Sequence, residues 1–274
     1  MSLSLHAGPA AKTNRVPTDF AKQENPDQEK GATILREFRN LGIAGDYYLE
    51  FQLRVLPRRG EETVFVGQLW GSRNVLGTIS RVVLADGHGG QRQLLIQNGP
   101  EPMAWAWQTG QTVMPVSSVE HLFEPLLPET ELTLFDLQMP YLFWDDFVFE
   151  GVSKIMGRAA HTFLLRPPLD AVPAYASVQA VRVQLDTQFH ALVQSTLYND
   201  AVQAAKTLTV RDLKKVDDQW MVKAIDLRNE LTRDKTRFQV TRAAVNLDLS
   251  PRLFDPGTLG ETIARPTNLI SLGP

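Results

Sequence analysis

An alternation of apolar and polar side chains, repeating every two residues, is the feature that most constrains how this chain folds. It begins near Tyr47, after which single polar residues separate Leu49, Phe51, Leu53 and Val55. A two-residue period places alternate side chains on opposite faces of a β-strand. The pattern returns many times with short turns between the repeats, so we predict an antiparallel sheet rather than a succession of βαβ units.

The predicted sheet has about ten to twelve strands. They cover residues 47–55, 63–70, 76–85, 94–97, 103–108, 147–156, 158–166, 178–186, 189–198, 206–213, 219–228 and 236–248. Turn-forming residues lie between them at 57–60, 71–74, 86–90, Asn199-Asp200 and Asp217-Asp218. Gly, Asn and Asp are favoured in such turns because they tolerate positive φ or bond to their own backbone.

Helices are expected in a few places. Residues 31–41 carry Ile34, Leu35, Phe38 and Leu41 at helical spacing, and Gly42 follows as a stop. An insertion at 117–144 begins with Ser117 and Glu120 in capping-box spacing. Its apolar stripe consists of Val119, Leu122, Phe123, Leu126 and Leu127, and its second part, 132–144, should break near Pro140. Residues 251–259 are a candidate short terminal helix.

Composition narrows the class of protein. The formal net charge of −3 argues against a nucleic-acid-binding protein, in which a basic excess is usual. No apolar stretch approaches the roughly 18 residues that a membrane-spanning helix needs. The chain has no cysteine, which excludes disulfides, thiol nucleophiles and cysteine-ligated zinc.

Residues that could carry catalysis are sparse. The five histidines show no metal-ligand spacing such as H-E-x-x-H. The loop 87–90 resembles an esterase oxyanion loop, but no G-x-S-x-G nucleophile motif accompanies it, so we interpret it as a hairpin. The acidic pairs Asp145-Asp146 and Asp217-Asp218 border strands and are typical of solvated turns. We therefore expect no catalytic residue, no metal site, no cofactor and no enzymatic activity.

Large apolar side chains are the more informative candidates. Trp105 and Trp107 share one face of a strand, as do Phe147 and Phe149. Met139, Tyr141 and Phe143 belong to the apolar part of the insertion. Two interpretations remain open, an ordinary core covered by helices or an apolar cavity that holds an acyl chain. Under the second, these seven residues contribute to one ligand cavity roofed by residues 117–144.

Five stretches of the sequence resemble one family. They are residues 64–81 (VFVGQLWGSRNVLGTISR), 134–144 (LFDLQMPYLFW), 157–167 (GRAAHTFLLRP), 219–240 (QWMVKAIDLRNELTRDKTRFQV) and 249–259 (LSPRLFDPGTL). The chain is similar there to the lipoprotein-localisation (LolA/LolB-like) proteins, in particular their outer-membrane lipoprotein-sorting branch. The resemblance spans about residues 33–260. It implies a β-rich α+β fold, a strongly curved and incomplete antiparallel β-barrel with helices on its concave face.

Residues 1–28 are rich in Pro, Asn, Gln and Lys, so we expect a flexible segment there, followed by one half-barrel domain at 29–260 and an irregular tail at 261–274. The resemblance also implies a function. The implied function is that of a non-enzymatic periplasmic carrier for lipoprotein acyl chains or another lipid. The alternative is an envelope protein-interaction or stress-sensing module on the same scaffold.

Arg81 is the candidate for the strand arginine that holds the helical lid in this family, and Arg166 is a second one. The expected location is the periplasm, with the signal peptide absent from this sequence and membrane anchoring of the full-length form left open.

Overall fold

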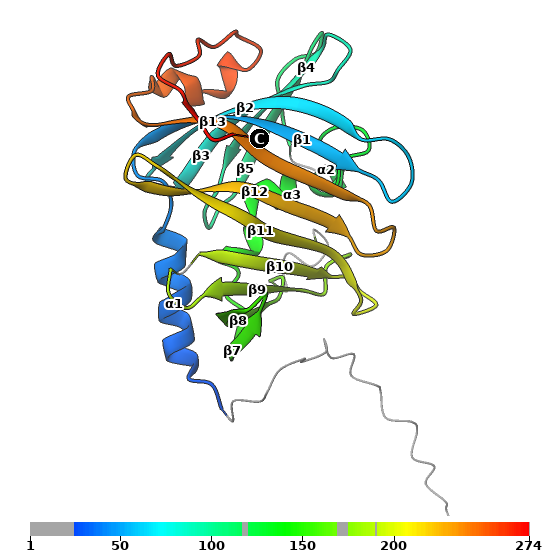
Figure 1. The fold of residues 1–274 in the computed structure, drawn as a ribbon, viewed down its shortest axis with the longest axis vertical. Coiled ribbons are helices and arrows are strands. Elements are labelled where there is room, and N and C mark those ends of the chain that lie inside the picture. Colours follow the sequence, from blue (N-terminus) through cyan, green and yellow to red (C-terminus); the bar gives the residue numbers. More distant parts are fainter. Residues whose placement is uncertain (1–24, 117–119, 169–174, 190, 274) are drawn as a thin grey trace, which may run out of the picture.

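The strands form an open antiparallel sheet, shown in the computed structural model in Figure 1. The structure describes residues 25–116, 120–168, 175–189 and 191–273. The strand order is β6-β5-β4-β3-β2-β1-β13-β12-β11-β10-β9-β8-β7, and β14 pairs with β13 beside this path. Within these residues the edge strands β6 and β7 do not pair with each other. The predicted fold, a curved and incomplete antiparallel barrel with helices, is confirmed.

The strand bounds agree closely with the alternation in the sequence. They are β1 (Asp46–Leu56), β2 (Thr63–Asn74), β3 (Gly77–Ala85), β4 (Gln91–Gln97), β5 (Met103–Gln108), β6 (Met114–Pro115), β7 (Phe147–Ile155), β8 (Arg158–Leu165), β9 (Ala180–Asp186), β10 (Leu192–Tyr198), β11 (Ala204–Val216), β12 (Gln219–Asn229), β13 (Lys235–Leu247) and β14 (Ile270–Ser271).

One pairing joins distant parts of the chain. β1 lies antiparallel to β13, from Asp46 opposite Leu247 to Leu56 opposite Lys235. The other adjacent strands of the path are consecutive in sequence and joined as hairpins. The chain thus runs from β1 outward to one edge at β6, and returns to β1 from the opposite edge at β7.

The insertion between β6 and β7 packs on the concave face of the sheet. It contains α2 (Glu120–Phe123), α3 (Leu134–Gln138) and the 3₁₀ helix η1 (Pro140–Phe143). A core of Leu53, Leu84 and Leu94 from the sheet packs against Leu126 and Leu134 of the insertion. Full burial of one such side chain stabilises the fold by about 1.5 to 3 kcal/mol.

Local sequence sets the ends of these short helices. The Thr133 side chain accepts from the Asp136 backbone, and the Asp136 carboxylate accepts from the Thr133 N–H at 2.9 Å, which closes a capping box at the start of α3. Met139 then adopts φ 45° and ends α3 directly before Pro140, the break that the sequence predicts. The other predicted capping box falls on Ser117, outside the described residues.

Helix α1 (Gln28–Asn40) covers the other end of the sheet. Asp27 caps it by accepting from the backbone N–H groups of Glu29 and Lys30 at 3.0 and 3.1 Å. The Gln28 carboxamide donates to the Phe149 carbonyl and accepts from the Phe149 N–H, both at 2.9 Å. These are the two bonds that a neighbouring strand would make, so Gln28 caps the edge of β7.

One expectation about the chain path is wrong. The predicted turn at 71–74 belongs to β2, and the hairpin turns instead at Val75 and Leu76. Gly71 is a strand residue, and a glycine is needed there because the Tyr47 ring occupies the space that a side chain would need. In the tail after residue 260, the two-residue strand β14 pairs with β13, and Leu272 is buried against Val240 and Ala243.

The expected flexible segment 1–28 lies mostly outside the described residues, and its last two residues cap and begin α1. Within the part of the chain that the structure describes, no helix is long and apolar enough to cross a membrane.

The close approach of α1 to β7 gives a first prediction. A Cβ built on Gly31 would lie 2.5 Å from the Phe149 Cβ, which is fixed by the strand backbone. Gly31→Val should therefore lower the free energy of unfolding by about 1 to 3 kcal/mol through overpacking. Lys30→Val, at an exposed position of the same helix, is the control and should cost only several tenths of a kcal/mol in helix propensity. Urea denaturation measures both, and equal losses would contradict the proposed packing constraint.

Candidate functional site

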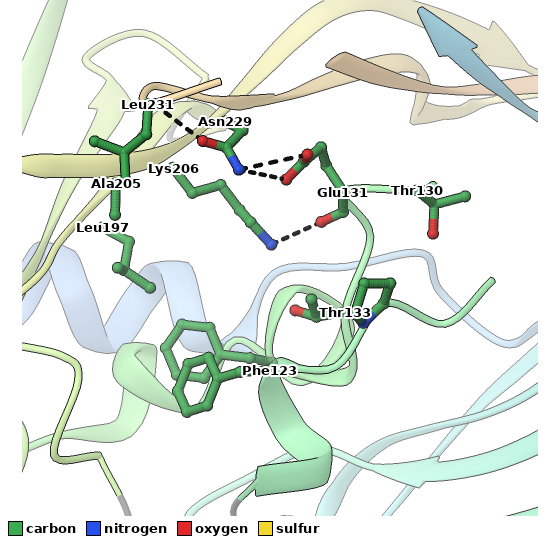
Figure 2. Close-up of a pocket in the computed structure, with 11 residues that line it drawn as sticks. Phe123, Thr130, Glu131, Thr133, Leu197, Ala205, Lys206, Asn229 and Leu231 are labelled. Carbon is green, nitrogen blue, oxygen red and sulfur yellow. Dashed lines mark hydrogen bonds between the residues drawn. The ribbon is translucent and has the colours of Figure 1, made fainter. Parts of the chain in front are cut away.

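A pocket of about 350 Å³ opens where the insertion meets strands β10 to β12 on the concave side (Figure 2). The insertion contributes one wall, and the ends of the three strands with the β12–β13 turn contribute the other. The lining residues are Phe123, Pro125, Thr130, Glu131, Thr133, Phe135, Leu197, Ala205, Lys206, Asn229 and Leu231. Its volume falls at the lower end of the range for small-molecule sites.

Polar groups tie the two walls together. The Lys206 ammonium donates to the Glu131 carbonyl at 2.6 Å and to the Asp136 carboxylate at 2.8 Å. The Asn229 amide donates to the Glu131 carboxylate at 3.3 Å, as Figure 2 shows. Lys206 and Asn229 are directly opposite each other on β11 and β12, so the strand register places both at the pocket.

Burial raises the pKa of Glu131, while the charge of Lys206 and the bond from Asn229 act in the opposite direction. Asp136 is nearly buried and already serves the α3 capping box and Lys206. The single ammonium of this pocket is therefore committed to the insertion, and it fixes the insertion to the sheet.

The apolar wall of the pocket continues into an aromatic core. Phe135 lies 4.8 Å from Phe123 and 5.5 Å from Tyr141, measured between ring centroids. Tyr141 is buried, and its hydroxyl donates to the Ser195 hydroxyl on β10 at 3.2 Å. Burial raises the pKa of the Tyr141 phenol, so the group is a neutral hydrogen-bonding side chain across the ordinary pH range. Behind the pocket the space is filled by packed rings.

Five of the predicted site residues belong to the insertion or to β7, the strand that follows it. Met139, Tyr141, Phe147 and Phe149 are part of, or packed against, the aromatic core formed with Phe163 and Val183. Phe143 is half-buried, and the Arg39 guanidinium of α1 lies 5.6 Å from its ring centroid. None of the five lines the pocket itself. Their part in ligand binding stays a prediction.

Trp105 and Trp107 do not lie with these residues, which corrects their expected position in one shared cavity. Both pack on the opposite face of the sheet, against Ile79, Leu95 and Leu259. Their neighbours Ala104 and Ala106 face the insertion. The two-residue period correctly put the tryptophans on one face, but the small alanines are the ones that let the insertion approach β5.

Arg81 also lies on the outer face, where it holds the C-terminal segment and not the insertion. Its side chain is 1% exposed. It donates to the carbonyls of Leu253, Thr258 and Glu261 at 3.3, 2.7 and 3.3 Å, and to the Gln93 side chain at 2.8 Å. The segment includes the 3₁₀ helices η3 (Pro251–Phe254) and η4 (Pro256–Thr258), which replace the single terminal helix expected there. Arg166, the second candidate, forms an exposed ion pair with Asp146.

The polar residues of the pocket were missed by the sequence analysis. Lys206 lies 75 positions after Glu131 in the sequence, and Asn229 lies 98 positions after it. No local spacing links them, and only the β11–β12 register and the path of the insertion bring them together. Among the described residues, no group of three or more His, Asp or Glu side chains is placed to hold a metal ion.

Comparisons with known proteins agree with this architecture. A family model described only as an uncharacterized protein matches residues 129–261. No match is found among curated proteins. Three solved structures align over most of both chains. A DUF1329 family protein from Desulfovibrio piger has a TM-score of 0.71 at 14% identity, covering 83% of this chain and 96% of its own.

The second structure is a Vibrio parahaemolyticus domain named for outer membrane lipoprotein sorting, with a TM-score of 0.73 at 18% identity and coverages of 85% and 99%. The third is a LolA superfamily protein from Nitrosomonas europaea, with a TM-score of 0.62 at 13% identity and coverages of 82% and 96%. The chain has the LolA-like fold. The resemblance drawn from its sequence is confirmed at the level of that fold.

The position of Arg81 yields a second prediction. Arg81→Met removes the donor for three backbone carbonyls and Gln93, and unsatisfied buried groups of this kind cost about 1 to 3 kcal/mol each. We expect a loss of several kcal/mol in unfolding free energy, with faster amide exchange in residues 251–261. Arg252→Met, which removes the exposed ion pair to Glu261, is the control and should cost less than about 1 kcal/mol. Faster exchange in the insertion with an unchanged C-terminal segment would contradict this assignment.

Proposed function

We propose that the protein is a non-enzymatic binding protein for lipid acyl chains. The end of an acyl chain enters at the pocket between the insertion and β10–β12. The observation that carries this proposal is the continuity of the pocket's apolar wall with the aromatic core. Phe123 and Phe135 line the pocket and pack into the core beneath the insertion. Each methylene moved from water into such a site gains about 0.8 kcal/mol.

Only the end of an acyl chain that enters first fits into the pocket as it stands. The rings of Tyr141, Phe149 and Phe163 fill the concave face behind the pocket. Deeper entry requires the insertion to move away from the sheet, which breaks the bonds from Lys206 and Asn229 to Glu131. In the proposed mechanism, the bonds among these three residues hold the insertion against the sheet until an acyl chain enters. The likeness to a domain named for lipoprotein sorting supports lipoprotein acyl chains as the cargo.

The filled core favours a second candidate function. A concave face packed with its own side chains needs no ligand, and the same scaffold then serves as an envelope protein-interaction module. Organic extraction of the purified protein followed by mass spectrometry separates the two. Co-purified acyl lipid supports the carrier function, and a lipid-free protein that also fails to bind fatty-acid probes supports the interaction module.

A variant at the pocket mouth gives the third prediction. Leu231 lines the pocket yet is 64% exposed, so Leu231→Asp leaves the core intact. We expect it to weaken binding of a fluorescent fatty acid by about tenfold or more, because a carboxylate must then be desolvated beside the chain. Trp220→Asp, at a 63% exposed apolar residue that does not line the pocket, is the matched control. Equal binding by both variants would place the acyl chain elsewhere.

We further propose a periplasmic location, which the likeness to an outer membrane lipoprotein-sorting domain supports. The fourth prediction is that the product of the natural full-length gene is found in the periplasmic or membrane fraction of osmotically shocked cells, apart from a cytoplasmic marker enzyme. Recovery of the protein only with that marker would contradict the location without bearing on acyl-chain binding.

A further inference from the structure

The outer face of the sheet carries an excess of basic side chains at the end where the pocket opens. Direct cross-strand neighbours there are Arg54 and Arg237, then Arg237 and Asp226. Arg211, Lys235 and Arg237 all approach the same Asp226 carboxylate, at 3.6, 3.7 and 2.6 Å. Although burial opposes ionisation of Asp226, the bond from Arg237 and these three charges lower its pKa. The Asp226 carboxylate is thus surrounded by three cationic side chains.

The surrounding turns extend this surface, which we call the basic end. The Arg58 N–H donates to the Asp234 carboxylate at 2.8 Å, so the β1–β2 and β12–β13 turns lie side by side, as Figure 1 also shows. The basic end has eight cations: Arg54, Arg58, Arg59, Arg211, Arg228, Arg233, Lys235 and Arg237. Its five carboxylates are Glu61, Glu62, Asp226, Glu230 and Asp234. The local excess is positive in a chain whose formal net charge is −3.

Exposed apolar side chains adjoin these charges. Val64, directly opposite Arg54, and Val66 on the same face are 48% and 55% exposed. Leu231 projects from the β12–β13 turn, between Arg228 and Arg233 in sequence, and it also lines the pocket. Cations that surround exposed aliphatic residues suit a surface with anionic headgroups above an apolar layer. An acidic protein partner would match the charges but would leave the aliphatic residues without a specific role.

The pocket and the basic end meet at one rim. Asn229 lines the pocket, while its sequence neighbour Arg228 is exposed on the opposite face, as the two-residue period requires. A flat surface that contacts the β12–β13 turn therefore lies next to the pocket opening. We propose that the basic end docks the protein on anionic phospholipid bilayers and presents the pocket to the membrane. The role given to the pocket rests on the proposed function, but the docking itself does not.

Vesicle flotation tests this fifth prediction. The protein should float with vesicles of phosphatidylcholine mixed with phosphatidylglycerol, remain unbound with pure phosphatidylcholine, and dissociate as salt is raised. Each basic residue near an anionic surface contributes about fivefold to binding, so the triple variant Arg58→Glu, Arg59→Glu and Arg233→Glu should bind at least about 100-fold more weakly. The matched control reverses three exposed lysines elsewhere, Lys154→Glu, Lys214→Glu and Lys215→Glu, and should float nearly as the wild type does.

Two further measurements keep the outcomes distinct. The neutralising variant Arg58→Gln, Arg59→Gln and Arg233→Gln should show a smaller loss, and circular dichroism reports whether each variant is folded. Fatty-acid probe binding in solution, without vesicles, should be unchanged in the arginine variants. Failure of the wild type to float, or equal loss in the lysine control, overturns the docking proposal. Normal flotation of a protein that binds no probe leaves docking intact and counts against the acyl-chain function.

Discussion

The pairing of β1 with β13 is the interaction on which the rest of the architecture depends. It joins the two series of hairpins into one sheet and leaves β6 and β7 as the edges. The residues between those edges must then cross from one side of the sheet to the other. The curvature gives that crossing a concave surface, where its apolar side chains are buried. The position of the insertion is therefore a consequence of strand order as much as of its own sequence.

The two faces of this sheet are covered by different parts of the chain. The concave face presents leucines and small alanines and receives the insertion, whereas the outer face near β3 to β5 presents Trp105, Trp107 and Arg81 and receives the C-terminal segment. Gly260 illustrates how close that second contact is, since its φ of 95° and the adjacent Trp107 ring exclude a side chain. Farther along the same outer face, rows of partly exposed charged side chains replace the apolar ones.

The pocket lies at the junction between two otherwise well-packed regions. One region centres on the leucines that the insertion covers, and the other on the aromatic core beneath α1 and η1. Polar contacts from Lys206 and Asn229 hold the insertion at this junction together with the apolar packing of Phe123 and Phe135. The Lys206 ammonium also bonds the buried Asp136 carboxylate, and hydrogen bonds to charged groups contribute about 1.5 to 3 kcal/mol each. These bonds therefore contribute to holding the insertion against the sheet at the rim of the pocket.

The sequence by itself determined the strands, the hairpin order and the break at Pro140, because these follow from periodicity and local backbone preferences. It also put Trp105 with Trp107 and Phe147 with Phe149. It did not determine which face of β5 the insertion would cover, and the predicted cavity joined residues that the sheet separates. Tertiary structure alone decided that choice and assembled Glu131, Lys206 and Asn229. A two-residue period fixes which side chains share a face, but the identity of the opposing surface depends on contacts between residues far apart in the chain.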